Sequence, residues 1–183
     1  GIEFKKILKI LPRITSVAGR LEKIGKIHNN SKVILDYAHT PAALESALSN
    51  LKEQFPFNKI NLIFGCGGDR DFKKRSLMGK IAEKYSNEIY LTDDNPRNEK
   101  PFEIRNEIKK GIKNKRIHEI PDRKKAIQEA VKNLKTGDIL LVAGKGHEKI
   151  QDYGKKRTFF SDQKVLLSSI RAKNKLLSKN IKL

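Results

Sequence analysis

Several polar segments of this 183-residue chain carry side chains suited to binding a small charged molecule. Asp94, Asn95 and Arg97 lie close together, and Arg70 and Glu148 lie in two other segments. An arginine guanidinium group can grip a carboxylate with two parallel hydrogen bonds, whereas a carboxylate can accept an ammonium group. Cations and anions gathered in one crevice would therefore suit a zwitterion such as an amino acid.

A simpler interpretation is that Arg97 and Asp94 pair with each other in the turn around Pro96. For this segment taken alone, that interpretation would be the better one. A second arginine and a third acid on other segments shift the balance toward a binding site.

The hydrophobic pattern indicates how the chain brings these segments together. From about residue 31, short apolar runs alternate with amphipathic stretches, which predicts βαβ units and a mostly parallel sheet with helices on both faces. We predict strands at 32–37, 60–64, 88–91, 116–120 and 138–143. Helices are predicted at 74–85, 101–112 and 122–134, and two more are predicted to begin at about 41 and 161.

Loops that follow parallel strands emerge at the same, carboxyl-terminal edge of the sheet, where α/β proteins bind ligands. Four polar segments follow predicted strands, and we expect them to line one crevice although they lie far apart in the sequence. They are DYAHTP (36–41), GCGGDRD (65–71), TDDNPR (92–97) and AGKGHE (143–148).

The glycine-rich segment 65–71 has two interpretations. Its backbone N–H groups could approach a phosphate, or its glycines could supply left-handed turns. Neither GxGxxG nor the P-loop pattern GxxxxGK[ST] occurs in the chain, so the chain cannot by itself be a P-loop ATPase. Cys66 is interpreted as a packing residue rather than a nucleophile.

His39 and His147 are both expected at this edge of the sheet. As metal ligands they would need a third partner, and the sequence offers neither a His pair at i, i+4 nor a supporting cysteine, so no metal site is predicted. Contact with a nucleotide or orientation of a loop is favoured for both. His147 could equally form a structural pair with Glu148.

Composition limits the possible partners. The 40 Lys and Arg against 21 Asp and Glu give a formal charge of +19, which would suit a polyanion. The lysines are spread along the whole chain and tryptophan is absent, so a solvated basic surface is a better interpretation than nucleic-acid binding.

One cysteine excludes an intramolecular disulfide, and no apolar run reaches the roughly 20 residues that span a bilayer. A cytoplasmic protein is predicted.

Five motifs, in the same order and at similar spacing, resemble one enzyme family. They are DYAHTP (36–41), FGCGGDRD (64–71), RSLMGKIAE (75–83), TDDNPR (92–97) and AGKGHE (143–148). Together they resemble the carboxy-terminal domain of the MurE-type Mur ligases, which add diaminopimelate to UDP-N-acetylmuramoyl-L-alanyl-D-glutamate in peptidoglycan synthesis. The resemblance runs from about Ser16 to about Val165 and implies a Rossmann-like fold.

The same resemblance implies a domain organisation. Residues 1–19 would be the end of a central ATPase domain and a hinge, residues 20–170 the amino-acid-binding domain, and residues 171–183 a basic tail with no family counterpart. The UDP-sugar domain and the P-loop would lie outside this chain, so we expect a fragment that is inactive alone.

In the implied reaction, ATP and Mg²⁺, held mainly by the central domain, convert the D-Glu carboxylate to an acyl phosphate, which the diaminopimelate amine attacks. Arg97 would clamp the distal carboxylate of meso-diaminopimelate; relatives that use L-lysine lack this arginine. Catalytic residues are not identified. The residues implied around the amino acid are Arg70, Asp94, Asn95, Pro96, Arg97, Gly144 and Glu148. Those implied to reach ATP are Asp36, His39 and Arg20.

Two alternatives from other classes remain open at this point. The first is a basic nucleic-acid-binding module that has kept the same fold, and the second is a non-catalytic interaction domain.

Overall fold

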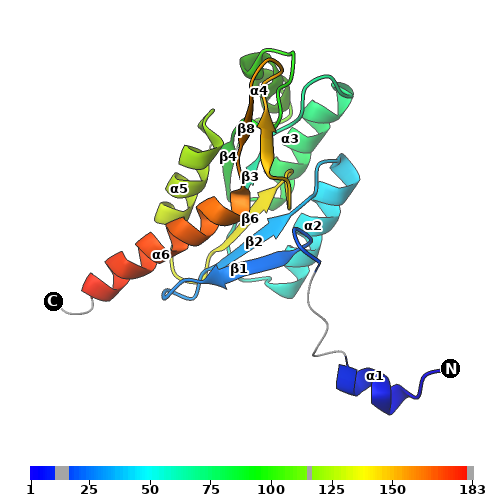
Figure 1. The fold of residues 1–183 in the computed structure, drawn as a ribbon, viewed down its shortest axis with the longest axis vertical. Coiled ribbons are helices and arrows are strands. Elements are labelled where there is room, and N and C mark those ends of the chain that lie inside the picture. The colour runs from blue at the N-terminus through cyan, green and yellow to red at the C-terminus, as the bar shows by residue number, and fades with distance from the viewer. Residues whose placement is uncertain (11–16, 115–116, 181–183) are drawn as a thin grey trace.

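The structure is a computed structural model that describes residues 1–10, 17–114 and 117–180. A six-stranded sheet in the order β1-β2-β6-β3-β4-β5 forms its centre (Figure 1). The strand β1 is antiparallel to β2 and every other neighbouring pair is parallel, so the predicted mostly parallel sheet is confirmed. The strands are β1 (Glu22–Lys26), β2 (Lys32–Asp36), β3 (Ile60–Phe64), β4 (Glu88–Leu91), β5 (Ile117–Glu119) and β6 (Ile139–Ala143).

Helices cover both faces of the sheet, as predicted (Figure 1). Successive side chains of a strand point to opposite faces. In β6, Leu141 packs in one core with α2, α3 and α4, whereas Leu140 packs in the other core with α5 and α6. The helices are α2 (Pro41–Gln54), α3 (Lys73–Tyr85), α4 (Pro101–Lys109), α5 (Arg123–Asn133) and α6 (Asp162–Asn180).

Two helix starts follow the signals in the sequence. The Thr40 side chain accepts a hydrogen bond from the backbone N–H of Ala43, and Pro41 occupies the first turn of α2. The Asp122 side chain accepts from the backbone N–H of Lys125 at the start of α5. Such caps satisfy N–H groups that the helix itself leaves unpaired.

The ends of several elements differ from the prediction. Helix α4 ends at Lys109 rather than at residue 112. Arg116, the predicted start of the fourth strand, lies outside the described residues, as do residues 11–16 of the predicted N-terminal segment and 181–183 of the predicted tail. Helix α6 continues to Asn180, so the boundary predicted at residue 170 falls inside this helix.

Four elements were not predicted. The strand β1 was missed because its sequence, EKIGK, is polar and forms an exposed edge. The short hairpin of β7 (Ile150–Asp152) and β8 (Arg157–Phe159) forms a separate two-stranded sheet. Helix α1 (Phe4–Ile10) has no buried residue and lies apart from the sheet in Figure 1. Among the described residues, no helix is long and apolar enough to cross a membrane.

Candidate functional site

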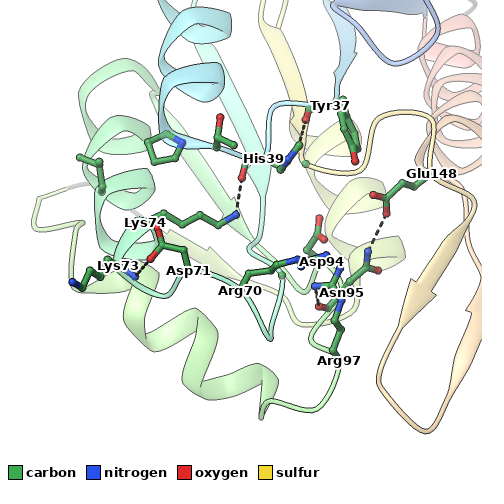
Figure 2. A pocket seen from close by; sticks show the side chains of 15 residues that line it. Tyr37, His39, Arg70, Asp71, Lys73, Lys74, Asp94, Asn95, Arg97 and Glu148 are labelled. Carbon is green, nitrogen blue, oxygen red and sulfur yellow. Dashed lines mark hydrogen bonds between the residues drawn. The ribbon is translucent and has the colours of Figure 1, made fainter.

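A cavity of about 620 Å³ opens at the carboxyl-terminal edge of the sheet (Figure 2). The loops after β2, β3, β4 and β6 all contribute to its wall, so the predicted convergence of the four segments is observed. Of the residues expected around an amino acid, all but Pro96 line this cavity. They are Arg70, Asp94, Asn95, Arg97, Gly144 and Glu148, with His39 from the group expected near ATP.

Arg97 does not pair with Asp94, which removes the simpler interpretation of this turn. Its Nη1 atom donates to the carbonyl oxygen of Gly68 at 2.7 Å and, at 3.5 Å, to that of Asn95. Among the described residues, Arg97 has no carboxylate partner within ion-pair distance. The half-buried guanidinium group therefore sits on the cavity wall with its charge uncompensated by an acid.

Arg70 supplies a second guanidinium group to the same cavity. Its side chain is exposed, and Figure 2 shows it extending toward Asp94 and Asn95. Within the part of the chain that the structure describes, no hydrogen bond or ion pair engages Arg70. The two arginines thus give the cavity a cationic end suited to a carboxylate.

Asn95 and Glu148 add a hydrogen-bonded pair to the site. The amide nitrogen of Asn95 donates to Glu148 Oε2 at 3.0 Å (Figure 2). Burial by itself would raise the pKa of Glu148, but hydrogen bonds and the charge of Lys145, with smaller contributions from Asn95 and Tyr37, outweigh it and lower the pKa. Glu148 is therefore an anion suited to an ammonium group.

Asp94 adds a further acidic group. Burial raises its pKa, although the positive charges of Arg123 and Lys145 oppose the shift. Its Oδ2 atom is buried without a hydrogen-bond partner among the described residues. A Cβ atom on Gly144 would lie 2.8 Å from this oxygen, and Gly144 has a φ of 111°, so only glycine fits beside Asp94.

The glycines of the loop after β3 do not supply left-handed turns, whereas an approach of this loop to a phosphate stays a prediction. The positive φ angles that mark left-handed turns occur at other glycines, and not at Gly65, Gly67 or Gly68. Instead, a Cβ atom on Gly68 would overlap the carbonyl oxygen of Pro96. The glycines let this loop pack directly against the backbone of the loop that carries Arg97, and Pro96 takes part as the packing surface.

The family model of the "Mur ligase, glutamate ligase domain" matches residues 19–146. The chain belongs to this family. The predicted relationship to the Mur ligases and the predicted fold are thereby confirmed.

Two similar relatives carry the same name. A protein of Rickettsia felis is 47% identical over 178 residues, and one of Buchnera aphidicola is 49% identical over 169 residues. Both are named UDP-N-acetylmuramoyl-L-alanyl-D-glutamate–2,6-diaminopimelate ligase. The matches cover 96% and 92% of this chain but 33% of each relative, so the chain spans about a third of their length.

A solved structure supports the same relationship. A ligase of that name superposes with a TM-score of 0.79 at 38% identity, over 94% of this chain and 35% of that chain. The superposition extends the likeness beyond residue 146, since it covers more of the chain than the family model does.

The Mur ligase domain places the residues expected near ATP around Tyr37. The guanidinium carbon of Arg20 lies 4.9 Å from the centre of the Tyr37 ring, and the His39 ring lies 4.6 Å from it. Both oxygens of Asp36 accept backbone N–H groups, from Leu21 and from Ala38, each at 2.7 Å. Asp36 therefore holds the segment after Arg20 against β2; direct contact with a nucleotide stays a prediction.

Cys66 and His147, two further residues considered in the sequence, both pack against neighbouring side chains. Cys66 is buried, and burial raises the pKa of its thiol to about 12, which agrees with a packing role. His147 packs against the Tyr37 ring at 5.4 Å. The alternative pairing of His147 with Glu148 does not occur among the described contacts.

The buried cations of this Mur ligase domain were not predicted from the sequence, and two of them contact Asn95, Glu99 or Glu148. Arg75 forms two 2.8 Å bonds with Glu99 and also donates to the carbonyl oxygen of Gly67, so it joins α3 to both arginine-bearing loops. Lys145 lies beneath Asn95 and Glu148. Lysine and arginine are usually exposed, and no local pattern distinguishes these two from their many exposed neighbours.

Proposed function

We propose that this chain is the amino-acid-binding domain of an ATP-dependent ligase that joins meso-diaminopimelate to UDP-N-acetylmuramoyl-L-alanyl-D-glutamate. The names of its relatives support this assignment, and the substrates come from those names. The observation that carries the proposal is the pair Arg97 and Arg70. Both line one cavity with Glu148, and neither has a carboxylate partner among the described residues.

The charges of the cavity match the charges of this amino acid. meso-Diaminopimelate has an ammonium and a carboxylate group at each of its two ends. One end can place its carboxylate against Arg97 and Arg70 and its ammonium group against Glu148. L-Lysine has no carboxylate at its far end, so it would leave the two guanidinium groups without a partner.

The other end of the amino acid would carry the reacting amine toward the rest of the enzyme. ATP supplies the energy by converting the D-Glu carboxylate to an acyl phosphate, and the amine then displaces phosphate to form the amide. Among the described residues, no group of three or more His, Cys, Asp or Glu could hold a metal ion. In keeping with the relationship to the Mur ligases, we assign Mg²⁺ and most of the ATP contacts to a central ATPase domain, with Arg20 and His39 approaching the nucleotide from this side.

Calorimetric titration of the 183-residue chain with meso-diaminopimelate and with L-lysine tests the proposal. We expect meso-diaminopimelate to bind at least about tenfold more tightly, since charge-assisted hydrogen bonds contribute roughly 1.5–3 kcal/mol each. Equal affinity for the two amino acids, or no binding of either, would contradict the assignment.

A further inference from the structure

Lys145 lies in the turn between β6 and β7, and its side chain is completely buried. A buried ammonium group is costly unless each of its N–H groups finds an acceptor. Lys145 Nζ has three acceptors: Asn95 Oδ1 at 2.8 Å, Glu148 Oε2 at 3.0 Å and the carbonyl oxygen of Ile150 at 2.7 Å. All three donors are therefore used within the protein, and none is left for a ligand.

Lys145 determines which way the Asn95 amide points. The amide oxygen accepts from Lys145 and also from the backbone N–H of Asp152, at 3.0 Å. Reversing the amide would place its NH₂ group against these two donors, which cannot accept it. The amide nitrogen must therefore face Glu148, to which it donates.

Lys145 also acts on the charge of Glu148. Burial is the largest single influence on this carboxyl and favours its neutral form. The hydrogen bond and charge of Lys145, with help from Asn95 and Tyr37, reverse the balance and lower the pKa of Glu148. Without Lys145, burial would act with much less opposition, and the pKa of Glu148 would rise.

Other elements around Glu148 do not replace this effect. Asp94, from the loop after β4, carries a like charge. Arg123, from α5, carries the opposite charge but is engaged in a fully buried ion pair with Asp162. Among the described residues, Lys145 is thus the cation in direct contact with Glu148.

We propose that Lys145 is a positioning residue for amine recognition: it holds the Asn95 amide and the Glu148 carboxylate in the arrangement that receives an ammonium group of the bound amino acid. Lys145 itself does not touch the ligand. The inference rests on the proposed function, because the ammonium group is that of the amino acid assigned to this cavity.

The variant Lys145→Met, in the 183-residue chain, tests the proposal, with Lys149→Met as the matched control. Methionine keeps the length of the side chain and removes the charge in both variants. Lys149 is exposed, and among the described residues its side chain forms no hydrogen bond or ion pair with Asn95 or Glu148. By calorimetry with meso-diaminopimelate, we expect Lys145→Met to bind about tenfold or more weakly. Its affinity should also fall off at a higher pH than that of the wild type as the solution is acidified, because Glu148 takes up its proton earlier.

A structural role alone would not shift the pH dependence of binding. The proposal is overturned if Lys145→Met binds meso-diaminopimelate with wild-type affinity, or if its affinity falls off at the same pH as that of the wild type. A second measurement needs neither the ligand nor a stable variant. The Glu148 carboxyl carbon of the wild-type chain, followed by NMR, should titrate below the ordinary glutamate range. A midpoint in or above that range also overturns it. Absence of wild-type binding would instead contradict the proposed function, and the NMR titration would still test the role of Lys145.

Discussion

Arg97 Nη1 donates a 2.7 Å hydrogen bond to the carbonyl oxygen of Gly68, 29 residues earlier in the chain. The bond joins the loop after β4 to the loop after β3 and fixes one edge of the guanidinium group. The rest of that group remains available at the cavity wall. Arg97, which we propose binds a carboxylate of the amino acid, is therefore held in place by the loop that also carries Arg70.

Replacement of Arg97 should change the choice of amino acid. We expect Arg97→Ala to weaken binding of meso-diaminopimelate by about 10- to 100-fold, the loss of one charge-assisted contact. Arg97→Lys should recover only part of the loss, because an ammonium group cannot form two parallel hydrogen bonds. Binding of L-lysine should hardly change. Calorimetry on the 183-residue chain measures all three.

The control for this prediction is Arg171→Ala, which removes the same charge from an exposed position on α6. If Arg171→Ala weakens binding as much as Arg97→Ala does, the general positive charge of the protein, and not the Arg97 contact, accounts for the affinity.

Gly68→Ala should destabilise the fold. The added Cβ atom would overlap the carbonyl oxygen of Pro96, and backbone on both sides must move to make room. Overpacking of this kind costs roughly 1–3 kcal/mol. Gly25→Ala is the control, because its Cβ atom would meet only side-chain atoms of Ile170, the nearer being the terminal Cδ1 at 3.3 Å. Urea unfolding compares the two; an equal loss of stability would contradict the close packing of the two loops.

The convergence of the four loops could be predicted because it follows from parallel strands alone. Apolar runs such as Ile139–Ala143 are buried on both faces and stand out in the sequence, and the polar residues that follow them must meet at one edge. The parallel strand order therefore predicts correctly that the two arginines and Glu148 line one cavity.

What the sequence did not predict depends on contacts between distant residues. Gly68 packs against Pro96, and Lys145 is buried beneath Asn95, because loops separated by tens of residues close on each other. The hairpin β7–β8 is short and partly exposed, so its residues show no strand periodicity. Neither a hydrophobic pattern nor a motif records such contacts.

The ion pair between Arg75 and Glu99 should make stability depend on pH. The hydrogen bond from Arg75 lowers the pKa of Glu99 in the folded state. A carboxyl with a lowered folded pKa stabilises the fold above its unfolded pKa, and this contribution is lost as the pH falls through the folded pKa. We therefore expect Glu99→Gln to lose stability at neutral pH and to unfold with a weaker dependence on acid than the wild type.

Glu103→Gln is the matched control for that experiment. Glu103 lies on the exposed side of α4, and its one ion pair among the described residues is with exposed Lys100 at 3.1 Å, a kind of contact that contributes little. Urea unfolding between about pH 7 and pH 3, which brackets the ordinary glutamate range, should show a reduced acid dependence in Glu99→Gln alone. The same reduction in both variants would mean that the Arg75 contact has no special part in it.

The buried pair of Arg123 and Asp162 should be costly to break and less costly to replace. Both side chains are fully buried, and Arg123 Nη2 lies 2.7 Å from Asp162 Oδ2, which joins α5 to the start of α6. Removing one partner leaves a buried charge without a counter-charge, so Asp162→Asn should lower the free energy of unfolding by about 3–5 kcal/mol. The double variant Arg123→Met with Asp162→Leu buries no charge and should be more stable than Asp162→Asn. Denaturant unfolding of the wild type and both variants measures this order of stability. A double variant that is less stable than Asp162→Asn would contradict the prediction, and would show that the pair holds α6 through its hydrogen bonds rather than through its balance of charge.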